Sequence, residues 1–131
     1  MKRNAIKIRS SCDNRIQLYV DKENAESIFN YVAQDERHRK KFKFICDIIL
    51  EGLRNPNVYG KAQIDKKSAN ITAMKFFKGQ ENDRVYCKEI KKEENVNIII
   101  ACELLEKKKT TKFKHREKTI IKKVSGYEYE I

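Results

Sequence analysis

Four residue types are scarce in this sequence: tryptophan, proline, glycine and histidine. It contains no tryptophan, one proline, four glycines and two histidines in 131 residues. Its cysteines include no C-x-x-C pair, so together with two histidines they do not form a zinc-binding pattern. We expect no metal and no cofactor. We expect buried free thiols in a reducing compartment for all four cysteines, Cys12, Cys46, Cys87 and Cys102.

Long hydrophobic runs are also missing. No stretch approaches the ~20 apolar residues needed to span a bilayer, and residues 1–11 hold no apolar run long enough for a signal peptide. The sequence therefore predicts a cytoplasmic protein that does not contact a membrane. A chain of this length can bury an ordinary core, so we expect a single domain over residues 1–131.

Acidic side chains are the minority among the charged residues. Lys and Arg number 30 and Asp and Glu number 19, which gives a net charge of +11. An excess of this size favours polyanionic partners such as RNA, DNA or an acidic protein. The alternative is a lysine-rich surface that serves only solubility.

Hydrophobic periodicity in the first half predicts two short strands and two helices. Apolar residues alternate with polar ones at 6–9 and 16–20, which is typical of strands. Helical spacing follows from Ala25 to Ala33, with Asp21 as the predicted N-cap. A second helix begins after Gln34-Asp35 and is ended by Gly52 and Asn55-Pro56. We expect the two helices to form an antiparallel hairpin.

The second half predicts a meander of three antiparallel strands, near residues 71–77, 84–91 and 96–105. Residues 57–70 are predicted to form a loop, with room for a short strand at 62–64. Ile120, Ile121 and Val124 mark one face of a short helix that Gly126 ends. The predicted fold class is α+β: N-terminal strands, a helical hairpin on one face of an antiparallel three-to-four-stranded sheet, and a short C-terminal helix.

A strongly basic segment follows the last predicted strand of the meander. Residues 106–118 read E-K-K-K-T-T-K-F-K-H-R-E-K, and Arg84 and Tyr86 lie on the neighbouring predicted strand. Such groups suit metal-free RNA cleavage. The RNA 2′-hydroxyl attacks the adjacent phosphorus once a base removes its proton, while cations stabilise the phosphorane and an acid protonates the leaving 5′-oxygen. A second basic run, residues 37–41, is a secondary candidate for nucleic-acid contact.

Three stretches carry a family resemblance: R-V-Y at 84–86, I-I-I at 98–100 and L-L-E-K-K-K-T-T-K at 104–112. They resemble the RelE/ParE superfamily of toxins from bacterial toxin–antitoxin modules, nearest to its HigB-like, phage-associated branch. The last stretch is similar to the lysine-rich segment that precedes the terminal helix in that family. The preceding strand, helix, helix, strand order is also similar.

The resemblance implies a RelE-like fold and a type II toxin. Such a toxin is a metal-independent, ribosome-dependent endoribonuclease that cuts mRNA, inhibits translation and is held inactive by a cognate antitoxin protein. The predicted catalytic residues are Arg84, Tyr86, Lys109, Lys112 and His115. The predicted RNA-binding residues are Lys107, Lys108, Lys114, Arg116, Tyr127 and Tyr129.

Each predicted role has a plainer alternative. The lysines can form a solvated basic turn, His115 can be an exposed residue at a helix start, and Tyr86 can pack across strands. Arg84 can make a surface ion pair that contributes little. Two other functions also fit the sequence: a non-enzymatic inhibitor of the ParE type, which binds a topoisomerase, and a basic nucleic-acid-binding or regulatory module.

Overall fold

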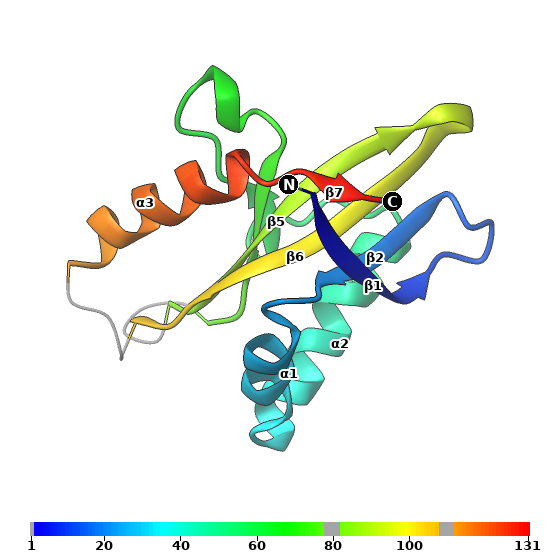
Figure 1. Cartoon of the computed structure of the whole chain (residues 1–131). Helices are drawn as coiled ribbons and strands as arrows, with labels where there is room; N and C mark the ends of the chain where they lie inside the picture. The colour runs from blue at the N-terminus through cyan, green and yellow to red at the C-terminus, as the bar shows by residue number, and fades with distance from the viewer. Residues whose placement is uncertain (1, 78–81, 108–111) are drawn as a thin grey trace.

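The computed structural model describes residues 2–77, 82–107 and 112–131. In this part of the chain, three α-helices pack on the two faces of one seven-stranded sheet (Figure 1). The strand order is β3-β4-β5-β6-β2-β1-β7. The strands are β1 (Arg3–Ser10), β2 (Ile16–Asp21), β3 (Tyr59–Lys61), β4 (Ile71–Lys75), β5 (Arg84–Lys92), β6 (Val96–Leu105) and β7 (Tyr129–Glu130). The helices are α1 (Ala25–Ala33), α2 (Glu36–Leu50) and α3 (Phe113–Ser125).

The α+β class is confirmed, but the prediction of a purely antiparallel sheet is wrong. The meander β4-β5-β6 is antiparallel as predicted. β2, however, pairs in parallel with β6, and the C-terminal β7 pairs in parallel with β1. Both parallel pairs join segments that are distant in sequence, so local periodicity carried no information about them. The result is one mixed sheet in place of a three-to-four-stranded one.

Local turn and cap chemistry explains both ends of α2 and the turn between β5 and β6. The side chain of Asp35 caps α2 by accepting the backbone N–H of His38 at 2.8 Å. Gly52 follows α2 with a φ of +70°, a conformation that glycine adopts without steric cost. Between β5 and β6, Glu94 and Asn95 also take positive φ values, 65° and 62°, and turn the chain as predicted.

Two predicted boundaries differ from the structure. Asp21 is not the N-cap of α1, because that helix begins at Ala25 after Asn24. Asp21 instead ends β2 as a fully buried carboxylate that accepts the backbone N–H groups of Glu23 and Asn24. The short strand expected at 62–64 lies earlier, at Tyr59–Lys61, where it pairs with β4.

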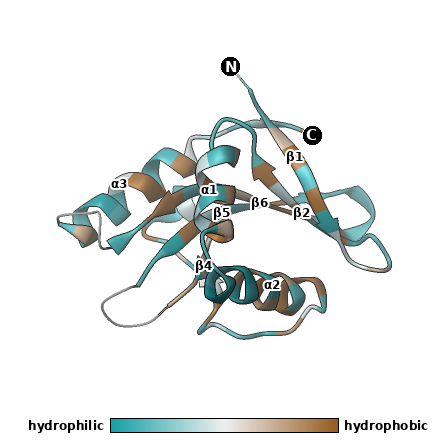
Figure 2. Ribbon diagram, turned by 90° about the horizontal axis from the view of Figure 1, so that it is seen from below, coloured by the Kyte–Doolittle hydropathy of each residue, from teal (hydrophilic) through white to brown (hydrophobic). Residues whose placement is uncertain are grey.

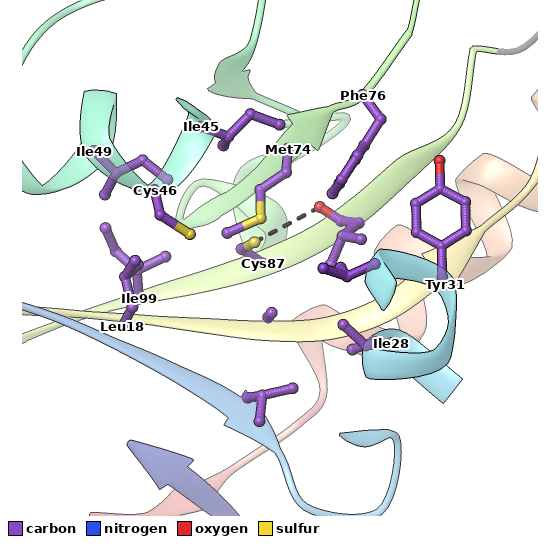
Figure 3. Packing of buried hydrophobic residues seen from close by; sticks show 14 of the residues in the cluster. Leu18, Ile28, Tyr31, Ile45, Cys46, Ile49, Met74, Phe76, Cys87 and Ile99 are labelled. Atoms are coloured by element: carbon purple, nitrogen blue, oxygen red, sulfur yellow. Dashed lines mark hydrogen bonds between the residues drawn. The ribbon is translucent and has the colours of Figure 1, made fainter. Parts of the chain in front are cut away.

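The sheet is covered on both faces because its strands alternate between two hydrophobic clusters. On β6, Ile99 and Ala101 face the helix pair, whereas Ile98, Ile100 and Cys102 face α3. Figure 2 shows the hydrophobic stretches of the strands between α3 on one side and α2 on the other. In Figure 3, α2 directs Ile45, Cys46 and Ile49 toward Met74 and Cys87 of the sheet.

The C-terminal helix lies on the opposite face of the sheet from α1 and α2 (Figure 1). Ile120, Ile121 and Val124 are buried against β4, β5 and β6, as their spacing predicted, and Gly126 follows the helix. None of the described helices is long and apolar enough to cross a bilayer.

Candidate functional site

A pocket opens where β5 begins, β6 ends and α3 begins. Arg84 at the start of β5 pairs with Leu105 at the end of β6. The strand register therefore places Arg84 close to Lys107, which follows β6 by two residues. The pocket has a volume of about 720 Å³ and is lined by Asn82, Arg84, Lys107, Lys112, Phe113, Lys114, His115 and Glu117. We call it the basic pocket. Five of the site residues predicted from the sequence line it: Arg84, Lys107, Lys112, Lys114 and His115.

The start of α3 adds to the positive potential of the basic pocket. Its first turn contains no acidic residue, and Lys114, His115 and Arg116 are exposed there. Unpaired backbone N–H groups at a helix N-terminus carry partial positive charge, so cations beside them are unfavourable unless an anion binds. Lys112 precedes the helix with a φ of 52°, a left-handed conformation that costs a non-glycine residue about 1–2 kcal/mol. A phosphate bound at this position would relieve the repulsion.

Beneath the cations, one carboxylate joins Arg84 to the core. The Tyr86 hydroxyl donates to Glu117 Oε2 at 2.7 Å, and Arg84 Nε lies 3.9 Å from the same oxygen. The second Arg84 contact is a 3.4 Å hydrogen bond from its Nη2 to Asn82 Oδ1. Arg84 Nε is buried and has no hydrogen-bond acceptor among the described residues. The guanidinium is therefore held in place by weak contacts and keeps a donor for a further anion.

Tyr86 lies under the basic pocket and does not line it. Its side chain is fully buried in the hydrophobic cluster beneath α3. Burial, reinforced by the hydrogen bond to Glu117, raises the pKa of its phenol well above the usual value. The ring has no exposed surface on which an RNA base could stack, so the cross-strand packing alternative describes its position.

Three further predicted residues lie outside the basic pocket. Arg116 is exposed on α3 but is not among the lining residues. The Tyr127 hydroxyl donates to Glu103, and the guanidinium of Arg3 lies 3.9 Å from the centre of the Tyr127 ring. The Tyr129 hydroxyl donates to Asp21 Oδ2 at 2.6 Å. These two phenols fasten the C-terminal segment to the sheet, away from Arg84. The last two predicted residues, Lys108 and Lys109, lie outside the described residues.

Sequence reasoning missed Glu117, the acidic member of the site. It is the one acidic residue between Glu106 and Glu128, in a segment otherwise rich in lysine. The available signal was a single carboxylate in a run of basic residues, because an isolated acidic side chain there indicates an ion pair with a cation elsewhere in the chain. That partner, Arg84, lies 33 positions earlier in the chain and was not identifiable from spacing.

Metal sites and reactive thiols each have requirements with which the described part of the chain can be compared. Among residues 2–77, 82–107 and 112–131, no group of three or more His, Cys, Asp or Glu side chains is arranged to hold a metal ion. Cys46, Cys87 and Cys102 are buried, and burial raises the pKa of all three thiols. The prediction that all four thiols are buried is wrong for Cys12, which is exposed in the turn between β1 and β2.

Comparison of the chain with protein-family models, with curated proteins and with solved structures finds no match in any of the three.

Proposed function

We propose that this protein is a RelE-type toxin, a metal-independent endoribonuclease that cleaves mRNA on the ribosome and inhibits translation. The observation that supports this is the basic pocket, in which Arg84 from the sheet meets Lys112, Lys114 and His115 from the start of α3. Cations from separate elements around one hollow suit a phosphodiester better than they suit an apolar ligand. The family resemblance of residues 84–86 and 104–112 supports the same function.

The chain supplies the groups for an attack by the RNA itself. In the proposed reaction, His115 removes the proton from the 2′-hydroxyl, whose oxygen then bonds to the adjacent phosphorus. Arg84 stabilises the negative charge of the phosphorane, with Lys114 beside it. Lys112 protonates the 5′-oxygen as its bond to phosphorus breaks. The products are a 2′,3′-cyclic phosphate and a 5′-hydroxyl, and no metal takes part.

The proposal includes two partners and a compartment. The ribosome presents the mRNA in the cytoplasm, and a cognate antitoxin protein blocks the toxin until it is removed. An antitoxin encoded beside this chain should restore growth when the two are expressed together.

Inducible expression in bacteria tests the proposed function. Induction should arrest growth and cut translated mRNA, and Arg84→Gln or His115→Ala should each relieve the arrest. Lys118→Ala is the matched control, because Lys118 is an exposed cation of the same helix that does not line the basic pocket and has no predicted role in RNA binding. Its expression should still arrest growth.

Cleavage chemistry is tested with the purified protein. Added to ribosomes that carry mRNA, it should leave RNA ends with 2′,3′-cyclic phosphates, and a 2′-deoxy substitution at the cut site should abolish the reaction. Growth arrest with intact mRNA and DNA damage would instead support a topoisomerase inhibitor. Normal growth on induction would leave a basic binding module.

A further inference from the structure

A second hollow with basic walls lies beside the basic pocket, where α2 begins and β4 ends. Its volume is about 340 Å³, and it is lined by Arg37, Lys41, Asn57, Val58, Lys75, Phe76 and Phe77. Three of these side chains are cations and none is a carboxylate. We call it the α2 pocket. Its two cations from α2 belong to the basic run 37–41, which the basic pocket does not include.

Two lysines of α2 outside the α2 pocket are already paired with carboxylates, whereas Arg39 is exposed and donates to the carbonyl of Ala33 at 2.9 Å. Lys40 lies 3.4 Å from Glu36, and Lys43 lies 2.8 Å from Asp47. Lys41, in contrast, has no carboxylate within ion-pair distance among the described residues, and its Nζ lies 5.6 Å from the centre of the Phe44 ring. Lys41 therefore brings a charge without a carboxylate partner to the α2 pocket, whereas Lys40 and Lys43 outside that pocket are paired.

Rigid contacts hold the walls of the α2 pocket. The guanidinium of Arg37 lies 3.8 Å from the centre of the Phe77 ring, and Lys75 donates to the carbonyl of Pro56 at 2.9 Å. A guanidinium stacked on an aromatic ring is held in one orientation. Such a preformed arrangement loses little side-chain entropy when an anion binds.

Lys75 connects the α2 pocket to the basic pocket. It is the direct cross-strand partner of Arg84 in the β4–β5 register, and it lines one pocket while Arg84 lines the other. The strand register places the two residues beside each other, and burial, and then the positive charge of Arg84, lowers the pKa of Lys75. The cations of the two pockets are thus adjacent, and they lie around the end of β4 and the start of β5.

A third pocket nearby marks where an anion would not bind. It lies between α1, α2, the start of β5 and the end of β6. Arg37 lines it as well as the α2 pocket, but the rest of its lining includes the carboxylates of Asp35, Asp83 and Glu106. Negative charge on that side repels a phosphate. An RNA strand could leave the basic pocket toward the α2 pocket or toward this acidic pocket. Only the path past Lys75 into the α2 pocket is lined by cations without carboxylates.

We propose that the α2 pocket binds a second phosphate of the RNA strand whose scissile phosphate lies in the basic pocket. This inference rests on the proposed function, and it makes the substrate a single strand several nucleotides long that bends around the end of β4. Single strands bind such grooves through backbone phosphates, with affinity that falls as salt rises.

The test measures binding with fluorescently labelled 2′-O-methyl RNA strands, which cannot be cleaved, in a series of lengths. The double variant Arg37→Gln, Lys41→Gln should lower the slope of log affinity against log salt by about 0.7, the value for one phosphate contact on a single strand. Its affinity for the longer strands should fall on the order of tenfold. Strands too short to leave the basic pocket should bind as they do to the wild type.

The matched control is Lys40→Gln, Lys43→Gln, which removes the same charge from the same helix outside the α2 pocket and should change the salt slope by less than half as much. Thermal melting checks that each variant is folded. If the Arg37 variant is unfolded because its stacking on Phe77 is lost, Lys41→Gln alone should still lower the slope by more than the control does.

Failure of this inference is distinguishable from failure of the proposed function. If the α2-pocket variants bind all lengths as tightly as the control does, this inference is wrong even when the wild type cleaves RNA. If the wild type binds the strands but cleaves no RNA on or off the ribosome, the proposed function is wrong instead. Loss of binding to ribosomes with unchanged binding to free strands would overturn the assignment to the cleaved strand.

Discussion

Replacing Tyr86 with phenylalanine separates a structural role from a catalytic one. The change removes one hydroxyl and leaves a fully buried ring in place. The lost contact is the 2.7 Å hydrogen bond to Glu117. A bond to a charged acceptor contributes about 1.5–3 kcal/mol, and because the Glu117 side chain is 31% exposed, water replaces part of it. We expect a loss of about 1.5 kcal/mol, which lowers Tm by on the order of 5 °C for a domain of this size.

Guanidinium titration at neutral pH measures this loss, and a double-mutant cycle with Glu117→Gln assigns it to the pair. The two substitutions should couple by about 1 kcal/mol if the hydroxyl and the carboxylate act together. Phe113→Leu is a suitable control because it lies beside the same pocket without contacting this hydrogen bond. It should not couple to Tyr86→Phe.

The pH dependence gives an independent measurement of the same residue. Burial, and then the hydrogen bond to Glu117, raises the pKa of Tyr86 in the folded protein. The stabilisation is therefore fully present below the unfolded pKa, near 10, and is lost as the pH rises toward the folded value. Above pH 10 the variant should lose stability less steeply than the wild type, by up to about 1.4 kcal/mol per pH unit.

The functional result decides between the two roles. Under conditions in which both proteins are folded, Tyr86→Phe should cleave RNA within about threefold of the wild type, whereas Arg84→Gln should lose about 100-fold or more. A Tyr86→Phe protein of unchanged stability with a 100-fold loss of cleavage would refute this reasoning, because the hydroxyl would then act on the substrate.

The remaining predictions concern the core. Asp21→Asn should cost about 1.5–3 kcal/mol in guanidinium titration, because it removes the charge of a buried carboxylate that accepts from Arg3, while Arg3 keeps its ion pair with Glu23. Burial alone would raise the pKa of Asp21, but hydrogen bonds lower it, so the wild type should lose this stability as the pH falls below about 4 and the variant should not. In thiol titration of the native protein, Cys12 should react first. Cys46 and Cys102, whose pKa burial raises to about 12, should react only on unfolding; a second fast thiol at neutral pH would contradict this.

Local patterns in the sequence predicted the elements that form the floor of the site. Alternation identified β5 and β6, and the spacing of Ile120, Ile121 and Val124 identified the buried face of α3. These patterns are informative because burial on a strand or helix follows the fixed period of its backbone. The basic segment and Arg84 were predicted as neighbours for the same reason, since β5 and β6 are joined by a short turn.

Tertiary structure alone decided the parallel pairing of β2 with β6 and the placement of Glu117 between Arg84 and Tyr86. It also decided that Lys75 stands beside Arg84, which links the basic pocket to the α2 pocket. Each of these contacts depends on strand register or on which sheet face a helix covers. Periodicity fixes which side of an element is buried, but the partner on that side is selected by packing among residues that are distant along the chain.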